Sequence, residues 1–251
     1  MTPFLSMASF APSREREVTA QDGHQRPEGS PAELLRATAV QESGLNVVIL
    51  TLGHCRGLSV SLADMAVLRS FAQVRRAQRL ASRPAAVNRA LFAGLLPGSS
   101  ADPPVPDSWL PTELREAGYQ TVGVGYDACF ASPEVIRGFE RFTRAGREAP
   151  EQLAELLNGI EPGRPFFAFA NLIDTRYTKG LDLFTQVAAA ERVDAALPAL
   201  LSALPENTLV AACSDYGPCF GEGNCWGMYR DHSAHRDVFV ARFRLDGEPL
   251  P

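Results

Sequence analysis

The first sustained apolar run of the chain covers residues 46–52 (NVVILTL) and is bounded by Gly44 and Gly53. Such a short, continuous run between glycines is typical of a strand that is buried on both faces of a sheet. Three later segments have the same character: TVGVG at 121–125, PFFAFANLI at 165–173 and TLVAACS at 208–214. We therefore expect four core strands.

Segments of helical periodicity lie between these apolar runs. Residues 61–80 repeat apolar side chains at spacings of three and four, which predicts one amphipathic helix packed on a sheet. Further helices are expected at 87–95, between Thr112 and Gly118, in PEQLAELLNG, and over a long stretch that follows Asp182. Regular alternation of helix and strand predicts an α/β fold whose sheet is mostly parallel.

Residues 1–43 are rich in Pro, Ser, Glu, Gln and Arg and show no sustained period of either kind. A segment of this composition predicts a disordered or loosely attached N-terminal tail. We expect residues 44–251 to form a single α/β domain, because a chain of 251 residues with 45% hydrophobic side chains can bury one sizeable core.

Charge and cysteine content narrow the classes of function. Lys and Arg number 24 against 29 Asp and Glu, and the net charge of -5 disfavours nucleic acid as a partner. No apolar run reaches the roughly 20 residues of a membrane span, so no membrane partner is expected. The five cysteines form an odd set without a CxxC pair, which favours a reducing cytoplasm.

Five separate segments resemble the sulfatase and alkaline-phosphatase superfamily, in particular its small sulfatase-like hydrolases, and they follow one another in the same order as in that family. These segments are NVVILTLGHCRG, FAGLLP, LPTELREAGYQTVGVG with GFERF after it, PFFAFANLIDTRY, and NTLVAACSDYGPCFGEGNCWG. The resemblance covers about residues 46–243. It implies an alkaline-phosphatase-like three-layer α/β/α sandwich with a mostly parallel central sheet. It also implies an active site built from divalent cations and a covalent nucleophile.

The reactive positions of the family are altered in this chain. Gly53 stands where the resemblance implies a metal-binding Asp, and Pro84 stands at the position of the nucleophile. Proline has no nucleophilic atom, although a small shift of register would bring in Ser82 with Arg89 as the basic residue. Arg176 replaces an imidazole and Tyr216 replaces the partner of Asp215, so that Asp215 alone keeps its family role.

Two hypotheses follow from these losses. The first is a pseudoenzyme without a cofactor, which presents a cleft to an anionic small molecule, a peptide or a protein partner. The ligand-binding residues that we predict for it are Arg56, Arg176, Lys179 and Asp215. The sequence leaves open whether the chain forms an oligomer.

The second hypothesis is a metal-dependent hydrolase or transferase whose site has been rebuilt around one divalent transition metal, zinc or iron. The metal ligands considered for it are His54, Cys55, Asp215, Tyr216, His232 and His235. Cys213, Cys219 and Cys225 recur at six-residue intervals just before the two histidines, and thiolate with imidazole suits zinc or iron. Ordinary buried thiols explain the same cysteines, so the first hypothesis is preferred.

Overall fold

The computed structural model describes residues 44–78, 84–93, 108–126, 133–176, 182–227 and 232–248, so the predicted tail lies outside the described residues. The strands are β1 (Asn46–Leu52), β2 (Arg75–Gln78), β3 (Gln120–Gly125), β4 (Arg141–Arg144), β5 (Phe166–Leu172), β6 (Thr208–Ser214), β7 (Cys219–Phe220), β8 (Trp226–Gly227) and β9 (Asp237–Arg244). The helices are α2 (Gly57–Leu62), α3 (Ala66–Phe71), α4 (Pro84–Ala93), α5 (Leu110–Glu116), α6 (Pro133–Ile136), α7 (Ala149–Gly159), α8 (Leu183–Leu201), the 3₁₀ turn η1 (Glu222–Asn224) and α9 (Ser233–Arg236).

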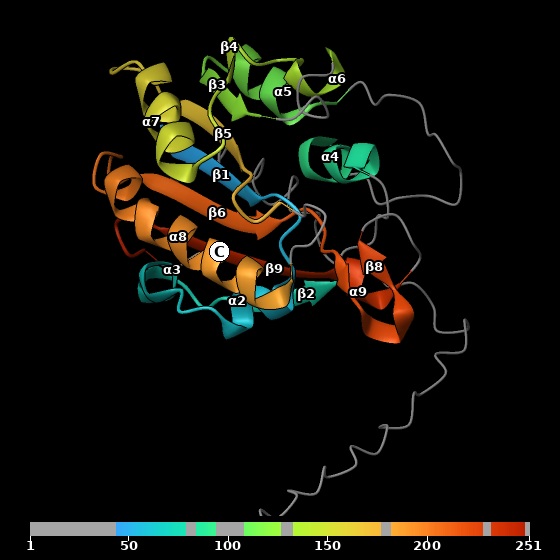
Figure 1. The fold of residues 1–251 in the computed structure, drawn as a ribbon. Helices are drawn as coiled ribbons and strands as arrows, with labels where there is room; N and C mark the ends of the chain where they lie inside the picture. Colours follow the sequence, from blue (N-terminus) through green and yellow to red (C-terminus); the bar gives the residue numbers. More distant parts are fainter. Residues whose placement is uncertain are drawn as a thin grey trace, which may run out of the picture.

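One seven-stranded sheet forms the centre of the molecule, in the order β2-β9-β6-β1-β5-β3-β4 (Figure 1). Strands β6, β1, β5, β3 and β4 run parallel, whereas β9 pairs antiparallel with both β6 and β2. The predicted α/β class with a mostly parallel sheet is therefore confirmed. A separate two-stranded ribbon, β7-β8, lies outside this sheet.

Apolar side chains of β1 alternate between two cores, as the two-residue period of a strand requires. Val48 and Leu50 join the core that contains Leu153 of α7 and Val193 of α8. The opposite face of the sheet packs against α4, α5 and α6, in a core whose members from β1 and these helices are Val47, Ile49, Phe92, Leu110, Leu114 and Val135. Helices thus cover both faces of the sheet, which gives the three-layer sandwich (Figure 1).

The four strands expected from the apolar runs are confirmed as β1, β3, β5 and β6. The single helix predicted over residues 61–80 is wrong, because that segment contains the end of α2, then α3 and then β2. Leu62 and Phe71, which belong to the predicted apolar face, are 56% and 43% exposed. The side chain of Asp194 accepts hydrogen bonds from the backbone N–H groups of Val67 (2.8 Å) and Leu68 (2.9 Å) and so fixes where α3 begins.

The limits of α5 differ from those expected from the sequence. Helix α5 begins at Leu110, before the expected cap Thr112, and Gly118 follows its end with a left-handed φ of 91°.

None of the helices in the described residues is long and apolar enough to cross a membrane.

We predict that Asp194→Ala destabilises the protein by about 1–2 kcal/mol, because two N–H groups at the start of α3 lose their acceptor. Glu191→Ala is the matched control, since Glu191 lies on the same helix and accepts one hydrogen bond, from Asp64 N (3.0 Å), at an exposed site. Its cost should stay below about 0.5 kcal/mol. Chemical denaturation measures both changes, and equal losses would contradict the capping role.

Candidate functional site

The carboxyl ends of β1, β5 and β6 meet at one edge of the sheet, where ligands bind in folds of this kind. Gln186 of α8 lies beneath this edge and is fully buried. Its Nε2 donates hydrogen bonds to the carbonyl oxygens of His54 (2.8 Å) and Thr175 (2.9 Å). Its Oε1 accepts hydrogen bonds from Arg56 N (3.1 Å) and Ser59 Oγ (2.7 Å). One amide thus holds the loops after β1 and β5 against α8.

His54, Asp215 and Tyr216 contact one another at the ends of β1 and β6. Asp215 Oδ1 accepts hydrogen bonds from the backbone N–H groups of His54 and Tyr216, each at 2.7 Å. The hydroxyl of Tyr216 lies 2.7 Å from His54 Nε2, and the two ring centroids are 4.5 Å apart. His54 has a left-handed φ of 58°, which the bond from its N–H to Asp215 helps to hold. These side chains therefore bind one another and the backbone.

Cys55 belongs to the apolar core that also contains Val193 of α8. Its side chain is fully buried, and burial raises the pKa of the Cys55 thiol far above its ordinary value. The residue therefore keeps its proton at neutral pH, and a buried neutral thiol is a poor nucleophile.

Arg56 lies in a different place from Arg176. It is buried, pairs with Glu222, and has its Nε 3.6 Å from Oδ2 of Asp237. Asp237 also binds Arg76, with 2.9 Å between Oδ1 and Nη2. The charge of Arg56 is thus compensated by two carboxylates. It lines a cavity of about 550 Å³ together with these residues and His232.

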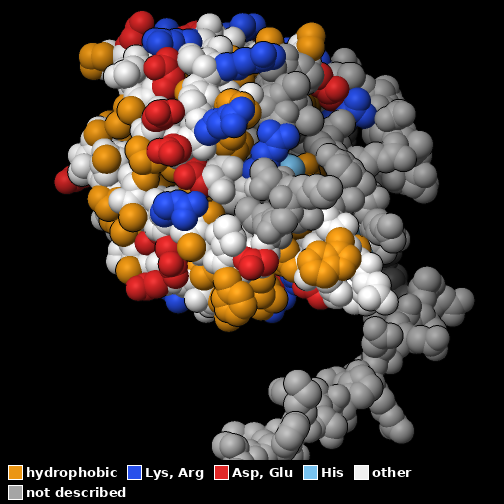
Figure 2. Space-filling view, viewed as in Figure 1, with side chains coloured by type: hydrophobic (Ala, Val, Ile, Leu, Met, Phe, Trp, Pro, Cys, Tyr) orange, Lys and Arg blue, Asp and Glu red, His pale blue; other side chains and the backbone are white. Residues whose placement is uncertain are grey.

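Arg176 lines a larger pocket, of about 840 Å³, next to the ends of β3 and β5. The polar residues of its lining are Tyr126, Arg147, Glu148, Asp174, Arg176 and Arg192, contributed by the strand ends, the start of α7 and the middle of α8. Arg147 Nε donates a hydrogen bond to Tyr126 Oη (2.7 Å), and its guanidinium lies 5.1 Å from the centroid of that ring. Figure 2 shows several basic side chains near the middle of the face that carries α7 and α8. We name this cavity the arginine pocket.

Asp174 is the acidic group of the arginine pocket whose protonation is perturbed. Burial raises the pKa of its carboxyl above the ordinary value, although backbone hydrogen bonds and the charge of Arg192 act in the opposite direction. Its Oδ2 is buried and, among the described residues, has no hydrogen-bond partner.

Sequence reasoning placed Arg176 at this edge but missed Arg147 and Arg192, because their position depends on how α7 and α8 pack on the sheet. Lys179 lies outside the described residues. Arg56 and Asp215 are close to the edge, yet neither lines the arginine pocket. The four predicted ligand-binding residues are therefore not brought together within the described part of the chain.

The metal ligands considered from the sequence divide into two groups. At the strand ends, Asp215 Oδ1 and His54 Nε2 are engaged as described above, and Cys55 is in the core. The residues present there do not fit the divalent cation that the fold implies, since Gly53 supplies no carboxylate. His232 and His235 lie elsewhere, near Cys219 and Cys225.

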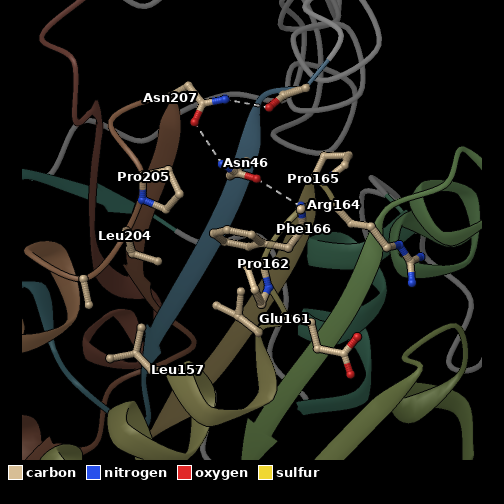
Figure 3. Close-up of a pocket in the computed structure, with 14 residues that line it drawn as sticks. Asn46, Leu157, Glu161, Pro162, Arg164, Pro165, Phe166, Leu204, Pro205 and Asn207 are labelled. Atoms are coloured by element: carbon tan, nitrogen blue, oxygen red, sulfur yellow. Dashed lines mark hydrogen bonds between the residues drawn. The ribbon is translucent and has the colours of Figure 1, made fainter.

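A further pocket, of about 540 Å³, lies at the opposite, amino edge of the sheet (Figure 3). Asn46 begins β1 there, donates a hydrogen bond to Asn207 Oδ1 (3.1 Å) and accepts one from Phe166 N (3.1 Å). Prolines and aliphatic side chains form much of the remaining lining. The pocket lacks the cluster of ionisable groups found at the carboxyl edge, and we assign it no chemistry.

No protein-family model and no curated protein sequence matches the chain. Solved structures do match. An alkaline phosphatase superfamily protein from Vibrio parahaemolyticus is 16% identical, with a TM-score of 0.62 over 83% of this chain and 62% of its own. The C-terminal periplasmic domain of EcEptC from Escherichia coli, in complex with Zn, is 15% identical, with a TM-score of 0.58 over 81% of this chain and 73% of its own.

Lipoteichoic acid synthase LtaP from Listeria monocytogenes is 12% identical, with a TM-score of 0.60 over 80% of this chain and 65% of its own. The chain therefore has the fold of the alkaline phosphatase superfamily, as the sequence resemblance implied. It spans less than two thirds of the length of the Vibrio and Listeria proteins.

We predict that Asp174→Asn stabilises the protein more at neutral pH than at acid pH. Because the folded state raises the pKa of Asp174, it binds that proton more tightly than the unfolded chain, and the resulting stability is lost as pH rises through the folded-state pKa. Asparagine carries no such proton. The melting temperature of the variant minus that of the wild type should increase from about pH 4 to about pH 8. A difference that stays constant would contradict the raised pKa.

Proposed function

We propose that this chain is a non-catalytic protein on an alkaline phosphatase superfamily fold that binds a small anionic molecule in the arginine pocket. The observation that carries the proposal is the meeting of Arg147, Arg176 and Arg192 around one cavity at the carboxyl edge of the sheet. We place this function in the cytoplasm, on the odd number of cysteines and the free thiols of Cys55 and Cys213, although Cys219 and Cys225 form a disulfide, and we assign it no cofactor.

The charge of the arginine pocket favours an anion. Three guanidinium groups face two carboxyl groups, those of Glu148 and Asp174. The raised pKa of Asp174 weakens the negative side of this balance further. Guanidinium groups bind phosphate, sulfate and carboxylate through paired N–H donors, and these charge-assisted hydrogen bonds are stronger than neutral ones.

The size of the arginine pocket favours a small molecule over a peptide or a protein. Its volume of about 840 Å³ falls within the usual range of small-ligand sites, roughly 300–1,000 Å³. The ring of Tyr126, against which Arg147 is held, offers an apolar surface beside the charges. This combination suits an anionic group attached to a compact organic body.

Two features of the chain argue against hydrolysis at the strand ends. Pro84, at the position of the family nucleophile, has no nucleophilic atom. A Cβ added to Gly53 would lie 3.2 Å from the carbonyl oxygen of Leu172, so an aspartate at this position would require its neighbour to shift by a few tenths of an ångström. The nucleophile and the first metal ligand that the resemblance implies are therefore both missing.

We predict that inorganic phosphate, sulfate or O-phosphoethanolamine binds the protein, as measured by isothermal titration calorimetry. Arg147→Gln and Arg192→Gln should each weaken that binding about tenfold or more, since a charge-assisted hydrogen bond contributes about 1.5–3 kcal/mol. Arg164→Gln is the control, because Arg164 is an arginine of the amino-edge pocket that pairs with Glu140. Equal weakening by all three variants, or no binding of any of the three anions, would overturn the proposal.

We also predict that the protein does not turn over aryl sulfate or aryl phosphate esters, with or without added Zn²⁺. The triple variant Gly53→Asp, Pro84→Ser, Tyr216→His should recover little activity because of the crowding at Gly53. Turnover by the wild-type protein that is lost in His54→Ala but kept in Arg147→Gln would instead support the alternative, a rebuilt metal-dependent hydrolase.

A further inference from the structure

The segment after β6 forms a small lobe that contains β7, η1, β8 and α9. Its apolar cluster consists of Cys219, Cys225 and Ala234 within the described residues. Trp226, its largest side chain, is 63% exposed. So small a core cannot order a lobe by burial alone, and small units of this kind usually depend on a cross-link or a bound metal.

Cys219 and Cys225 are bonded as a disulfide, with their Cα atoms 5.5 Å apart. A disulfide by itself explains the cross-link. It does not explain why two histidines are directed at the same pair of sulfur atoms. His232 offers a ring nitrogen that lies within 4.8 Å of both sulfurs, and His235 contacts both.

His235 is oriented as a metal ligand would be. Its Nδ1 lies 2.6 Å from the carbonyl oxygen of Gly217, and because a carbonyl only accepts, Nδ1 carries the proton. In the tautomer with its proton on Nδ1, Nε2 presents its lone pair to Cys219 Sγ at 3.5 Å and Cys225 Sγ at 4.0 Å. A disulfide has no proton to donate to this lone pair. A backbone carbonyl bound to the other ring nitrogen is the usual outer partner of a metal-bound histidine.

The two distances from His235 Nε2 to the sulfur atoms also match those of a tetrahedral zinc centre. With Zn–S near 2.3 Å and Zn–N near 2.05 Å, a sulfur and a nitrogen ligand of such a centre lie about 3.6 Å apart. The two contacts of His235 Nε2, at 3.5 and 4.0 Å, bracket this value. Two thiolates and two imidazoles form a ligand set that selects zinc, and Cys219, Cys225 and His235 are buried, as in closed structural sites.

We propose that Cys219, Cys225, His232 and His235 bind one structural zinc ion when the two cysteines are reduced. A thiol reductant first supplies two electrons and two protons, so that the S–S bond breaks and two S–H groups form while the reductant becomes a disulfide. Zinc binding then replaces both S–H protons, which pass to solvent, by two Zn–S bonds, and the two imidazoles complete the tetrahedron.

The four ligands contribute unequally. His232 Nδ1 accepts a hydrogen bond from Ala234 N (3.2 Å) and so caps α9. Binding through this nitrogen would give up the cap, and binding through the other would need a proton on Nδ1 in its place. His235 has no such competing role. Loss of His235 should therefore weaken zinc binding more than loss of His232.

Bound zinc would also fix the turn between the two cysteines, which carries Glu222. This residue pairs with Arg56 and accepts a hydrogen bond from Phe220 N (2.7 Å). The centre would thereby order the lobe against the loop after β1. It is a different site from the arginine pocket, so the binding of anions and the binding of zinc can fail independently.

The experiment measures metal in the full-length protein after treatment with a phosphine reductant. We expect about one zinc per chain by mass spectrometry of the metal content. Cobalt substitution should give an intense tetrahedral d–d spectrum with a thiolate-to-cobalt charge-transfer band. This spectrum identifies cysteine ligands in the wild-type protein, without any variant that has to fold. Protein with the Cys219–Cys225 disulfide intact should bind neither metal.

Matched variants then assign the ligands. The double variant Cys219→Ser, Cys225→Ser should abolish the charge-transfer band, and each single variant should weaken it. His235→Gln should weaken zinc affinity about tenfold or more, since loss of even an outer partner of a metal ligand costs about 10–100-fold. Cys213→Ala, a cysteine of β6 outside the group, is the control and should leave binding unchanged. Reduced wild-type protein in which mass spectrometry shows the Cys219–Cys225 bond to be broken, but which binds no metal, would overturn the proposal. So would metal binding that survives the Cys219 and Cys225 substitutions.

Discussion

The carboxyl edge of the sheet depends on how its buried polar groups are satisfied. The loops after β1 and β5 leave the strand ladder there, so their carbonyl and N–H groups need partners other than a neighbouring strand. Gln186 of α8 supplies the partner of three such backbone groups, and its side-chain oxygen also accepts a hydrogen bond from the hydroxyl of Ser59. The four hydrogen bonds are 2.7–3.1 Å long. An unsatisfied buried group costs roughly 1–3 kcal/mol, so loss of this one amide should cost more free energy than loss of a typical surface ion pair, which contributes about 0–1 kcal/mol.

The same requirement explains the contacts of Asp215, His54 and Tyr216, which lie where the sequence resemblance implies metal ligands. Asp215 keeps a carboxylate at the end of β6, but it stabilises the backbone N–H groups of His54 and Tyr216. His54 and Tyr216 then bind each other. At the strand ends these three side chains thus bind one another and the backbone, beside a glycine, Gly53, that supplies no carboxylate. The arginine pocket, to which we have assigned the proposed function, is lined by other residues.

Sequence patterns predicted the elements whose residues bury both faces, such as β1 and β5, because continuous apolar runs have one dominant interpretation. The pattern over residues 61–80 misled because its apolar spacing fits a helix, whereas the start of α3 is set by Asp194, a residue more than 120 positions away. The arginine pocket was only partly predictable for the same reason. Arg176 follows a recognisable strand, but nothing local indicates that Arg147 and Arg192 face the same cavity.

The cysteines show that even spacing along the sequence does not predict which side chains lie together in the fold. Cys213, Cys219 and Cys225 are evenly spaced, yet the first belongs to β6 and the other two to the lobe. What marks the pair in the lobe as candidate metal ligands is the direction of nearby nitrogen lone pairs, which spacing does not encode. The bond between His235 Nδ1 and the Gly217 carbonyl fixes that direction. Since Gly217 lies two residues after Asp215, the loop that begins at the end of β6 also orients the histidine of the lobe.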